Sequence, residues 1–526
     1  MSEYELLLKN ANIITMDKDL SRKRWLAVRD GRIAATGTDD ASAPAAKTVL
    51  DMGGKTVMPG LTDTHAHATM TGIGYRGVDL AGAGSVAEIL ERVEAFCGAD
   101  RGGGVIFGGN LPMGEQLKEG RLPDRYELDG VSGGRPVMLV LWTVHGGVLN
   151  SAALPLARLA PEMAYVEKDG VFNDDHTAFH VIGNLYATLS EKDFRDIYFG
   201  IAADCAARGI TTLHALDGMM VKDDKDTEVL KDILTELPIE FVPYTQTFDV
   251  DKIHGYGMKQ IGGCLSLDGS PPQLTAAFSA PYPVAPHTRG FLNFTDEKLY
   301  RFVTECTKRD MQVGFHAIGD RAIDQILYIY RQVDRELGIR SLRHRIEHFS
   351  TPSERHMEMA AEMNIIATAQ PGIGNMLDNE NGNGFEAFAP PETARDIERF
   401  ARVVRYGILT AGGSDSPVTP LDCFAGIDAA VNAFNPERRV TLDEALRMYT
   451  VNAAHTEHRE NEKGSLEPGK YADMIIVSND PYAVKGRISL DTVGLEATYK
   501  RGGIVYDALS IPKDPGNDPR PRAVRK

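Results

Sequence analysis

Apolar and polar residues alternate along both ends of this 526-residue chain. The alternation has a period of two at residues 6–16, 25–28 and 32–36, with glycine-containing turns between them, and it returns at residues 472–477 and 493–499. A two-residue period is typical of β-strands that bury one face. We therefore expect the two ends of the chain to form one small β-sheet body together.

Between these ends, short β-rich strings alternate with amphipathic helical stretches. Such alternation predicts an α/β fold in which helices cross between parallel strands. Helices with the apolar spacing of an outer layer are expected at residues 296–309, 321–337 and 392–406. The strings that are candidates for parallel strands are residues 61–67, 137–145, 211–215, 239–246, 264–267, 312–316, 344–348, 365–369 and 409–414.

One long segment does not fit a regular β/α repeat. Residues 68–197 are too many for the connection that follows a single strand. We therefore assign the string at 137–145 to an inserted subdomain, which leaves eight strands for the main sheet.

Composition and charge narrow the class of protein. The chain is 43% hydrophobic and 25% charged, as expected of a soluble globular protein, and its apolar runs, such as residues 137–144, are too short to cross a bilayer. A formal net charge of −17 repels nucleic acid and anionic lipid, and the one basic cluster is the short tail at 520–526. Neither nucleic acid nor a membrane is expected as a partner.

The cysteines and the first residues bear on the cellular compartment. Five cysteines are scattered without CxxC spacing, which fits a reducing compartment better than a disulfide framework. The first residues, Met-Ser-Glu-Tyr-Glu, lack a basic start followed by an apolar stretch. A cytoplasmic location is the expectation.

The strongest chemical signal is the segment Pro-Gly-Leu-Thr-Asp-Thr-His-Ala-His at residues 59–67. In a strand, residues two apart point the same way, so His65 and His67 would present two imidazoles to one side. Such a pair suits one Zn²⁺ ion. By itself, the same pattern also fits two histidines that are hydrogen-bonded near a strand end.

Three further strings end in a possible ligand. His316 closes an apolar string before a glycine-containing loop, His348 ends the string at 344–348, and Asp415 follows the string at 409–414. In the string at 344–348, His344, Ile346 and His348 are expected to share one face. Together with His65 and His67, these residues place His or Asp at the carboxyl ends of four strands, where a β/α barrel builds its active site.

The order of these motifs resembles the amidohydrolase superfamily, and within it the YtcJ-like branch that includes N-substituted formamide deformylase. The resemblance runs from about residue 12 to residue 506. The motifs that carry it are PGLTDTHAH at 59–67, HAIGD at 316–320, RIEH at 345–348, GSDSP at 413–417, LDEAL at 442–446, YTVNAA at 449–454 and GSLEPGKYAD at 464–473.

The resemblance implies a fold and a set of ligands. The fold would be a distorted TIM (β/α)8 barrel at 59–459, with an inserted subdomain at about 68–197, and a small β-sandwich built from 1–58 plus 460–526. His65 and His67 would bind one metal ion, with Asp415, which also handles protons. His316 and His348 would serve a second metal position. One or two divalent ions, Zn²⁺ foremost, and a homodimer are likewise what the resemblance implies.

Cys264 marks a departure from the pattern of this branch. Many branch members carry a lysine at this place on the fourth strand, and in the wider superfamily a carboxylated lysine commonly bridges two metals. The string here is Gly263-Cys264-Leu265-Ser266-Leu267-Asp268-Gly269-Ser270. A thiolate is a good zinc ligand, so Cys264 would bridge or cap the site; alternatively it is a buried, inert cysteine beside a single metal.

Other polar residues near strand ends are candidates for substrate contacts. His145 lies in a segment, Trp142 to Ser151, that resembles the DGHxxxxNS segment of the branch, and we expect it to orient the substrate or its oxyanion. Asp268 and His214 would line the pocket, with a structural role as the alternative. His344 is expected to point the same way as His348 but deeper in the barrel, as a packed, hydrogen-bonded histidine.

These residues together predict a metal-dependent hydrolase. The expected reaction is cleavage of an amide or related C–N bond, other than a peptide bond, in a small N-substituted molecule by metal-activated water. Asp415 would accept the proton of the water and deliver it to the departing nitrogen. Two alternatives stay open: the same barrel and metal site used for deamination, decarboxylation or isomerisation, or a metal-free barrel used for binding.

Overall fold

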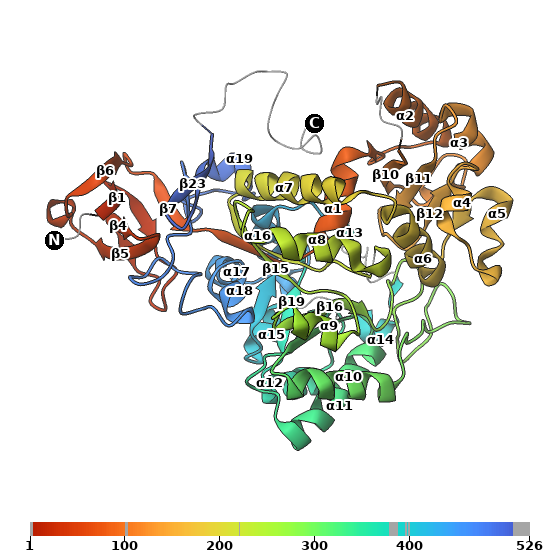
Figure 1. Ribbon diagram of the computed structural model, residues 1–526. Coiled ribbons are helices and arrows are strands. Elements are labelled where there is room, and N and C mark those ends of the chain that lie inside the picture. The colour runs from red at the N-terminus through yellow and green to blue at the C-terminus, as the bar shows by residue number, and fades with distance from the viewer. Residues whose placement is uncertain are drawn as a thin grey trace.

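The computed structural model describes residues 4–99, 104–219, 221–377, 388–394, 397 and 400–508 (Figure 1). Two sheets at one end of the molecule contain strands from the chain termini. The first sheet has the order β5-β4-β1-β6 and contains β1 (Tyr4–Lys9), β4 (Trp25–Arg29), β5 (Arg32–Gly37) and β6 (Ala46–Asp51). The second has the order β23-β22-β21-β7-β2-β3 and contains β2 (Asn12–Ile14), β3 (Arg22–Lys23), β7 (Thr56–Pro59), β21 (Met474–Val477), β22 (Leu495–Lys500) and β23 (Gly503–Asp507).

The two terminal sheets share an apolar core. Leu8 and Leu26 of the first sheet pack in one cluster with Val57, Met474 and Tyr499 of the second. The expected joint β body of the two ends is therefore present. The string at 6–16 is not one strand, however, because the chain turns at Asn10 (φ 52°) between β1 and β2.

Eight parallel strands alternate with helices in the middle of the chain. They form two sheets, in the orders β15-β14-β8 and β16-β17-β18-β19-β20. The strands are β8 (Leu61–Ala66), β14 (Ile210–Ala215), β15 (Glu240–Pro243), β16 (Gln260–Ser266), β17 (Gln312–Ala317), β18 (Arg345–His348), β19 (Ile366–Ala369) and β20 (Thr410–Gly412).

Hydrogen bonds join the edges of these two sheets. The Asp415 amide donates to the His65 carbonyl at 2.7 Å, and the His67 amide donates to the Ser416 carbonyl at 2.9 Å. At the other pair of edges, the Gly262 amide donates to the Thr245 carbonyl at 2.9 Å. These contacts bring the carboxyl ends of β8, β16, β17, β18 and the segment after β20 to one side of the molecule.

Amphipathic helices cover the outside of the parallel strands. In α10 (Asp296–Lys308) the buried residues Leu299, Phe302, Val303 and Cys306 follow helical spacing, and the Thr295 side chain caps the first turn. The predicted helices at 296–309 and 321–337 agree with α10 and with α11 (Asp320–Leu337). The single helix expected at 392–406 is wrong for the described residues, because two helices, α14 (Pro391–Ala394) and α15 (Phe400–Arg405), lie there with a turn at residue 397. Residues 395, 396, 398 and 399 lie outside the described part of the chain.

The segment between β8 and β14 contains a separate sheet. Its order is β13-β12-β11-β10-β9, with β9 (Val78–Asp79), β10 (Ile106–Leu111), β11 (Val137–Leu141), β12 (Gly147–Leu149) and β13 (Val171–Phe172). Helices α2 (Val86–Ala99), α3 (Arg125–Val131) and α6 (Asp175–Tyr186) belong to the same segment, which lies at the far end of the view from the N-terminal sheet (Figure 1). The string at 137–145 thus stands apart from the eight parallel strands.

Among the helices that the structure describes, none is both long enough and apolar enough to cross a bilayer.

Candidate metal centre and pocket

Three predicted ligands meet beyond the carboxyl ends of β8 and β20. The Nε2 atoms of His65 and His67 lie 3.2 Å and 3.1 Å from the same oxygen, Oδ1 of Asp415. All three side chains are buried, and their candidate ligand atoms all lie within 4.8 Å of one another. His65 in β8 and His67, one residue beyond the end of this strand, therefore direct both imidazoles to one point, as the motif predicts.

The other ring nitrogen of each histidine has an acceptor of its own. Nδ1 of His65 lies 2.7 Å from Oε2 of Glu347, and Nδ1 of His67 lies 2.8 Å from the Leu216 carbonyl oxygen. A carbonyl or carboxylate oxygen can only accept, so these partners assign the proton of each neutral ring to Nδ1. The lone pairs of both Nε2 atoms then face Asp415.

This arrangement tests whether the residues suit a metal ion. Two imidazole lone pairs directed at a carboxylate oxygen repel it unless a positive charge lies among them. The Nε2 atom of His65 is also fully buried and has no aligned hydrogen-bond partner. Two neutral histidines, each oriented through Nδ1, with one carboxylate make a donor set typical of Zn²⁺ and related divalent ions. The residues fit the group.

The pKa values of His67 and Asp415 also indicate that positive charge is favourable between these side chains. Burial opposes the charged form of His67, but Asp415 and Cys264 outweigh it and raise its pKa to about 10. Burial likewise opposes ionisation of Asp415, yet the neighbouring imidazoles, that of His65 first, hold the pKa of its carboxyl well below the ordinary value. Without a metal ion, protonated imidazoles would thus supply the positive charge that the Asp415 carboxylate and the Cys264 thiolate require.

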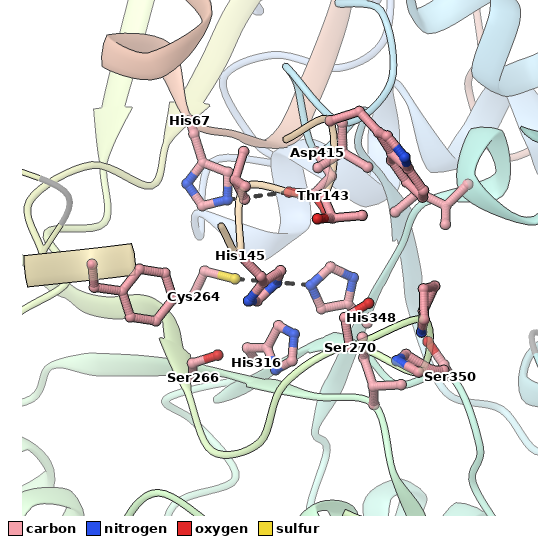
Figure 2. A pocket seen from close by; sticks show the side chains of 18 of the residues that line it. His67, Thr143, His145, Cys264, Ser266, Ser270, His316, His348, Ser350 and Asp415 are labelled. Atoms are coloured by element: carbon pink, nitrogen blue, oxygen red, sulfur yellow. Dashed lines mark hydrogen bonds and ion pairs between the residues drawn. The ribbon is translucent and has the colours of Figure 1, made fainter. Parts of the chain in front are cut away.

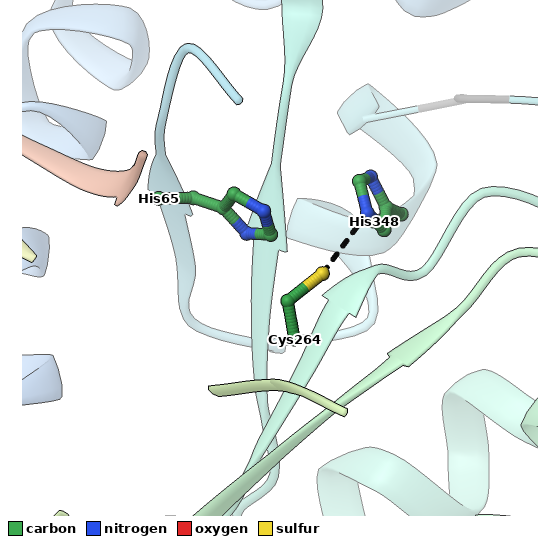
Figure 3. A group of neighbouring side chains, drawn as sticks. All are labelled: His65, Cys264 and His348. Carbon is green, nitrogen blue, oxygen red and sulfur yellow. Dashed lines mark hydrogen bonds between the residues drawn. The ribbon is translucent and has the colours of Figure 1, made fainter. Parts of the chain in front are cut away.

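A second candidate group shares His65 with the first. His65, Cys264 and His348 place their ligand atoms within 4.8 Å of one another, and Figure 3 shows these side chains converging. The Cys264 sulfur lies 3.8 Å from Nε2 of His348. Burial raises the pKa of the Cys264 thiol, but the neighbouring histidines, His65 above all, lower it well below its usual range. A thiolate at this place would complete a His-Cys-His donor set.

Two glycines set the position of Cys264. Gly262 (φ 88°) and Gly263 (φ 54°) adopt left-handed backbone conformations, and the register of β16 against β17 shifts between Ile261 and Leu265. A β-carbon on Gly262 would come within 2.6 Å of the Gly314 carbonyl oxygen. The bulge therefore depends on glycine, and it turns the following cysteine toward the pocket.

His316 and His348 lie side by side, but they differ in their neighbours. Their ring centroids are 4.5 Å apart, and both residues line the pocket. Nδ1 of His316 lies 3.2 Å from Oδ1 of Asp268, and its pKa is raised to about 8, since Asp268 and Cys264 outweigh burial. His348 belongs to the second three-residue group, whereas His316 belongs to neither group found among the described residues.

The predicted shared face of His344 and His348 is wrong, whereas the prediction of a packed, hydrogen-bonded His344 is confirmed, because its Nδ1 accepts from the Val313 amide at 3.1 Å. His344 packs against Tyr330 of α11, with ring centroids 5.0 Å apart, and burial lowers its pKa to about 3. It is the alternate residues, Arg345 and Glu347, that reach across to β8. His348 still enters the pocket because its left-handed backbone (φ 68°) interrupts the alternation of the strand.

Asp268 and His214 are not among the described residues that line the pocket, and their contacts fit the structural role that the sequence left open for them. The carboxylate of Asp268 is fully buried and accepts the backbone amides of Ala277, Ile318 and Gly319 at 2.9, 3.1 and 2.8 Å, so it fixes the loops beside His316.

His214 lies deeper than the pocket. It stacks on Tyr244, accepts from Arg345 at 2.9 Å and lies 3.3 Å from Oε1 of Glu457. Its polar atoms therefore contact residues beneath the pocket rather than its wall.

His145 reaches the same pocket from the inserted segment. It follows β11, lies near Phe179 of α6 with ring centroids 5.9 Å apart, and lines the pocket together with His67, Cys264 and Asp415 (Figure 2). The pocket thus lies between the inserted segment and the carboxyl ends of the parallel strands. Its placement is compatible with the predicted contact to substrate.

Sequence reasoning missed the residues that orient the ligands. Glu347 holds His65, and in turn accepts from Arg345 at 2.8 and 2.9 Å and from Thr368. Asp63 accepts the His65 and Ser414 amides at 3.0 and 3.1 Å and so joins β8 to the segment that carries Asp415. Both carboxylates belong to the motifs quoted above. Asp63 lies two residues before His65 and Glu347 lies one residue before His348, and this proximity to a motif histidine could have identified them from the sequence.

The fold and the site define an α/β protein with a buried histidine, carboxylate and thiol cluster at the carboxyl ends of parallel strands. The model of the amidohydrolase family matches residues 48–506. The chain belongs to the amidohydrolase family, and as this match implies, its fold is TIM-barrel-like with additional domain structure.

Relatives along nearly the whole chain agree with this assignment. The protein LONG AFTER FAR-RED 3 of Arabidopsis thaliana is 27% identical, with 95% of this chain and 91% of that protein covered. N-substituted formamide deformylase of Arthrobacter pascens is also 27% identical, over 91% and 94% of the two chains. The predicted resemblance to the branch that includes this deformylase is confirmed.

A solved structure is similar over the same extent. An uncharacterised metal-dependent hydrolase from Pyrococcus horikoshii superposes with a TM-score of 0.78 at 25% identity, with 91% of this chain and 98% of that chain covered.

Proposed function

We propose that the protein is a metal-dependent hydrolase of an amide or related C–N bond, other than a peptide bond, in a small N-substituted molecule. In this proposal the eight parallel strands act as one closed (β/α)8 barrel at residues 59–459. Residues 68–197 form the inserted subdomain, and 1–58 plus 460–526 form the β-sandwich. The deformylase relative and the metal-dependent hydrolase neighbour support this choice.

The observation that carries the proposal is the convergence of His65 and His67 on Asp415. Both imidazoles direct Nε2 at one carboxylate oxygen while Nδ1 is held by an acceptor behind it. These three residues would hold the first divalent ion, Zn²⁺ foremost. Cys264, His348 and His316 would serve a second position. A divalent ion bound there would lower the pKa of water, so that a nucleophile is available at neutral pH, and would polarise a carbonyl oxygen.

The protein's own residues would divide the remaining work. Since Oδ1 of Asp415 takes both imidazole contacts, its other oxygen would accept a proton from the attacking water and return it to the departing nitrogen. His145, on the opposite wall of the pocket, would donate a hydrogen bond to the substrate oxygen. Glu347 and the Leu216 carbonyl keep the two imidazoles in the required tautomer.

Removal of the metal tests the proposal. Dialysis of the purified protein against a strong chelator should abolish hydrolysis of a panel of formamides, N-acyl amines and cyclic amides, and added Zn²⁺ should restore it. Metal content by elemental analysis should fall and recover in parallel. A His65→Ala, His67→Ala double variant should stay inactive after Zn²⁺ is added back. Full activity in a chelator-treated, metal-free sample would overturn the proposal.

A further inference from the structure

A chain of buried polar side chains runs from His65 to residues beneath the pocket. Glu347 holds Nδ1 of His65 and is itself bound through both carboxylate oxygens by Arg345. Nη1 of Arg345 donates to Nδ1 of His214 at 2.9 Å, and Nε2 of His214 lies 3.3 Å from Oε1 of Glu457. All five side chains are buried, so each of these contacts is shielded from water.

The contacts of His214 determine which of its two nitrogens carries the proton. The guanidinium of Arg345 can only donate, so Nδ1 of His214 must accept and the ring proton lies on Nε2, facing Glu457. Burial lowers the pKa of His214 and keeps the ring neutral, although Glu457 acts in the opposite direction. With the proton on Nδ1 instead, two donors would point at each other in a buried place. The contact with Arg345 therefore requires one tautomer.

Lys463 fixes the carboxylate that faces this tautomer. Glu457 directly follows α18 (Val451–Thr456), and its Oε2 lies 2.8 Å from Nζ of Lys463. The Lys463 side chain is buried, and it also lies 3.0 Å from Oε2 of Glu240 and donates to Oγ1 of Thr212 at 3.1 Å. One oxygen of Glu457 is thus occupied by the ammonium group, and the other is left for Nε2–H of His214.

Two other groups share in holding the guanidinium. Nη2 of Arg345 donates to the Thr64 carbonyl at 2.7 Å, and the guanidinium carbon lies 4.2 Å from the centroid of the Tyr244 ring. Loss of the contact with His214 should therefore shift Arg345 rather than release it. The consequence for His65 should be graded, and smaller than that of removing Glu347 itself.

We propose that Glu457 is a positioning residue for the candidate metal centre, because it selects the tautomer of His214 that accepts from Arg345. Arg345 in this place holds Glu347, and Glu347 orients the ring of His65 through its Nδ1–H. The inference rests on the metal binding in the proposed function, and it does not depend on which bond is hydrolysed.

The exchange of one oxygen for an amide nitrogen tests the inference. In Glu457→Gln, the ammonium group of Lys463 should keep the amide oxygen, which turns the amide nitrogen toward Nε2 of His214. Nε2 then has to accept, and the proton moves to Nδ1, where it opposes the guanidinium of Arg345. The affinity for Zn²⁺, measured by competition with a chelator, should fall about 3- to 10-fold, less than for a direct partner of a ligand. Parental affinity in the folded variant would overturn the inference and leave metal binding standing.

A second substitution should reverse this loss. In Glu457→Gln, Lys463→Met, methionine does not attract the amide oxygen, which can turn back and accept from Nε2–H of His214. Glu240 keeps Lys500 as a partner in this variant. The affinity for Zn²⁺ should return to within about twofold of the parent value, as expected of coupled neighbours. An affinity as low as that of Glu457→Gln would contradict the selection of a tautomer.

A variant at the far end of the same charge network controls for a merely structural role. Lys500 lies 3.1 Å from Oε2 of Glu240 and 2.8 Å from Oδ2 of Asp473, and these contacts involve neither Glu457 nor His214. Lys500→Met should lower the free energy of unfolding and leave the affinity for Zn²⁺ at the parent value. If the affinity falls with stability in Lys500→Met as it does in Glu457→Gln, the role of Glu457 is structural and the inference is wrong.

Neutron diffraction from metal-free crystals separates the inference from the proposed function. If the parent protein binds no Zn²⁺, the proposed function fails, and the deuterium positions then decide the inference. Deuterium on Nε2 of His214 in the parent and on Nδ1 in Glu457→Gln, together with a displaced His65 ring in the variant, would support it. Deuterium on Nδ1 of His214 in the parent, or the same His65 ring position in both proteins, would overturn it.

Discussion

Asp415→Asn will lower kcat by about 10²- to 10⁴-fold while the protein keeps its metal. The amide retains an oxygen that can remain near His65 and His67, but it cannot accept a proton from water or return one to the leaving nitrogen. The contacts at 3.2 and 3.1 Å show that the carboxylate lies within reach of both imidazoles and therefore of anything held between them. Elemental analysis and steady-state kinetics on one preparation measure both quantities.

A carboxylate far from the site provides the matched control. Asp232 is 68% exposed and pairs with its neighbour Lys231 on the surface. Asp232→Asn makes the same chemical change and should leave kcat within about twofold of the parent value, because exposed ion pairs contribute little. A near-parental kcat in Asp415→Asn, with metal bound, would remove the proton-transfer role of Asp415.

The second large effect concerns Glu347, the carboxylate beneath His65. It is fully buried and is held by Arg345 at 2.8 and 2.9 Å and by Thr368. Glu347→Ala leaves the Arg345 guanidinium buried without its counter-ion, so the free energy of unfolding should fall by about 3–5 kcal/mol. The affinity for Zn²⁺ should also fall, by about 10- to 100-fold, because His65 loses the acceptor that fixes its ring.

A double variant separates the two effects of Glu347. In Arg345→Met, Glu347→Leu both charges are replaced by apolar side chains, so most of the lost stability should return while the Zn²⁺ affinity stays low. Denaturant unfolding and competitive metal titration measure the two quantities. Glu362→Ala, which breaks an exposed ion pair with Arg331, should cost less than about 1 kcal/mol. Parental metal affinity in the double variant would contradict the positioning role of Glu347.

Much of the geometry of the candidate metal centre could be predicted, because its candidate ligands follow local rules. His65 and His67 share a face through the period of a strand, and Asp415 follows β20 at the side of the sheet where parallel strands present their carboxyl ends. Both signals depend on neighbours in the sequence. They hold in the structure because β8 and the segment after β20 are adjacent.

The failures occur where the backbone leaves its regular path. Strand alternation placed His344 on the face of His348, but Arg345 and Glu347 are the residues of β18 that contact β8, and His348 enters the pocket because its backbone is left-handed. The period of a strand carries no signal for a single residue with positive φ. The irregularity before Cys264 differs from the one at His348, because a pair of glycines, Gly262 and Gly263, is a sequence signal for a bulge.

Long-range partners were equally outside the reach of sequence patterns. Asp268 and His214 stand near strand ends, yet their polar atoms bind backbone amides and a buried arginine rather than the pocket. The pocket depends on how the inserted segment lies over the parallel strands, so Phe179 and Val418 line it together from positions 239 residues apart. Only tertiary structure reveals such pairs.

The most direct measurement is anomalous X-ray diffraction from a crystal of active protein at the zinc absorption edge. We expect a peak within about 2.0–2.2 Å of Nε2 of His65, Nε2 of His67 and an oxygen of Asp415. Active crystals without a divalent ion among these three residues would contradict it.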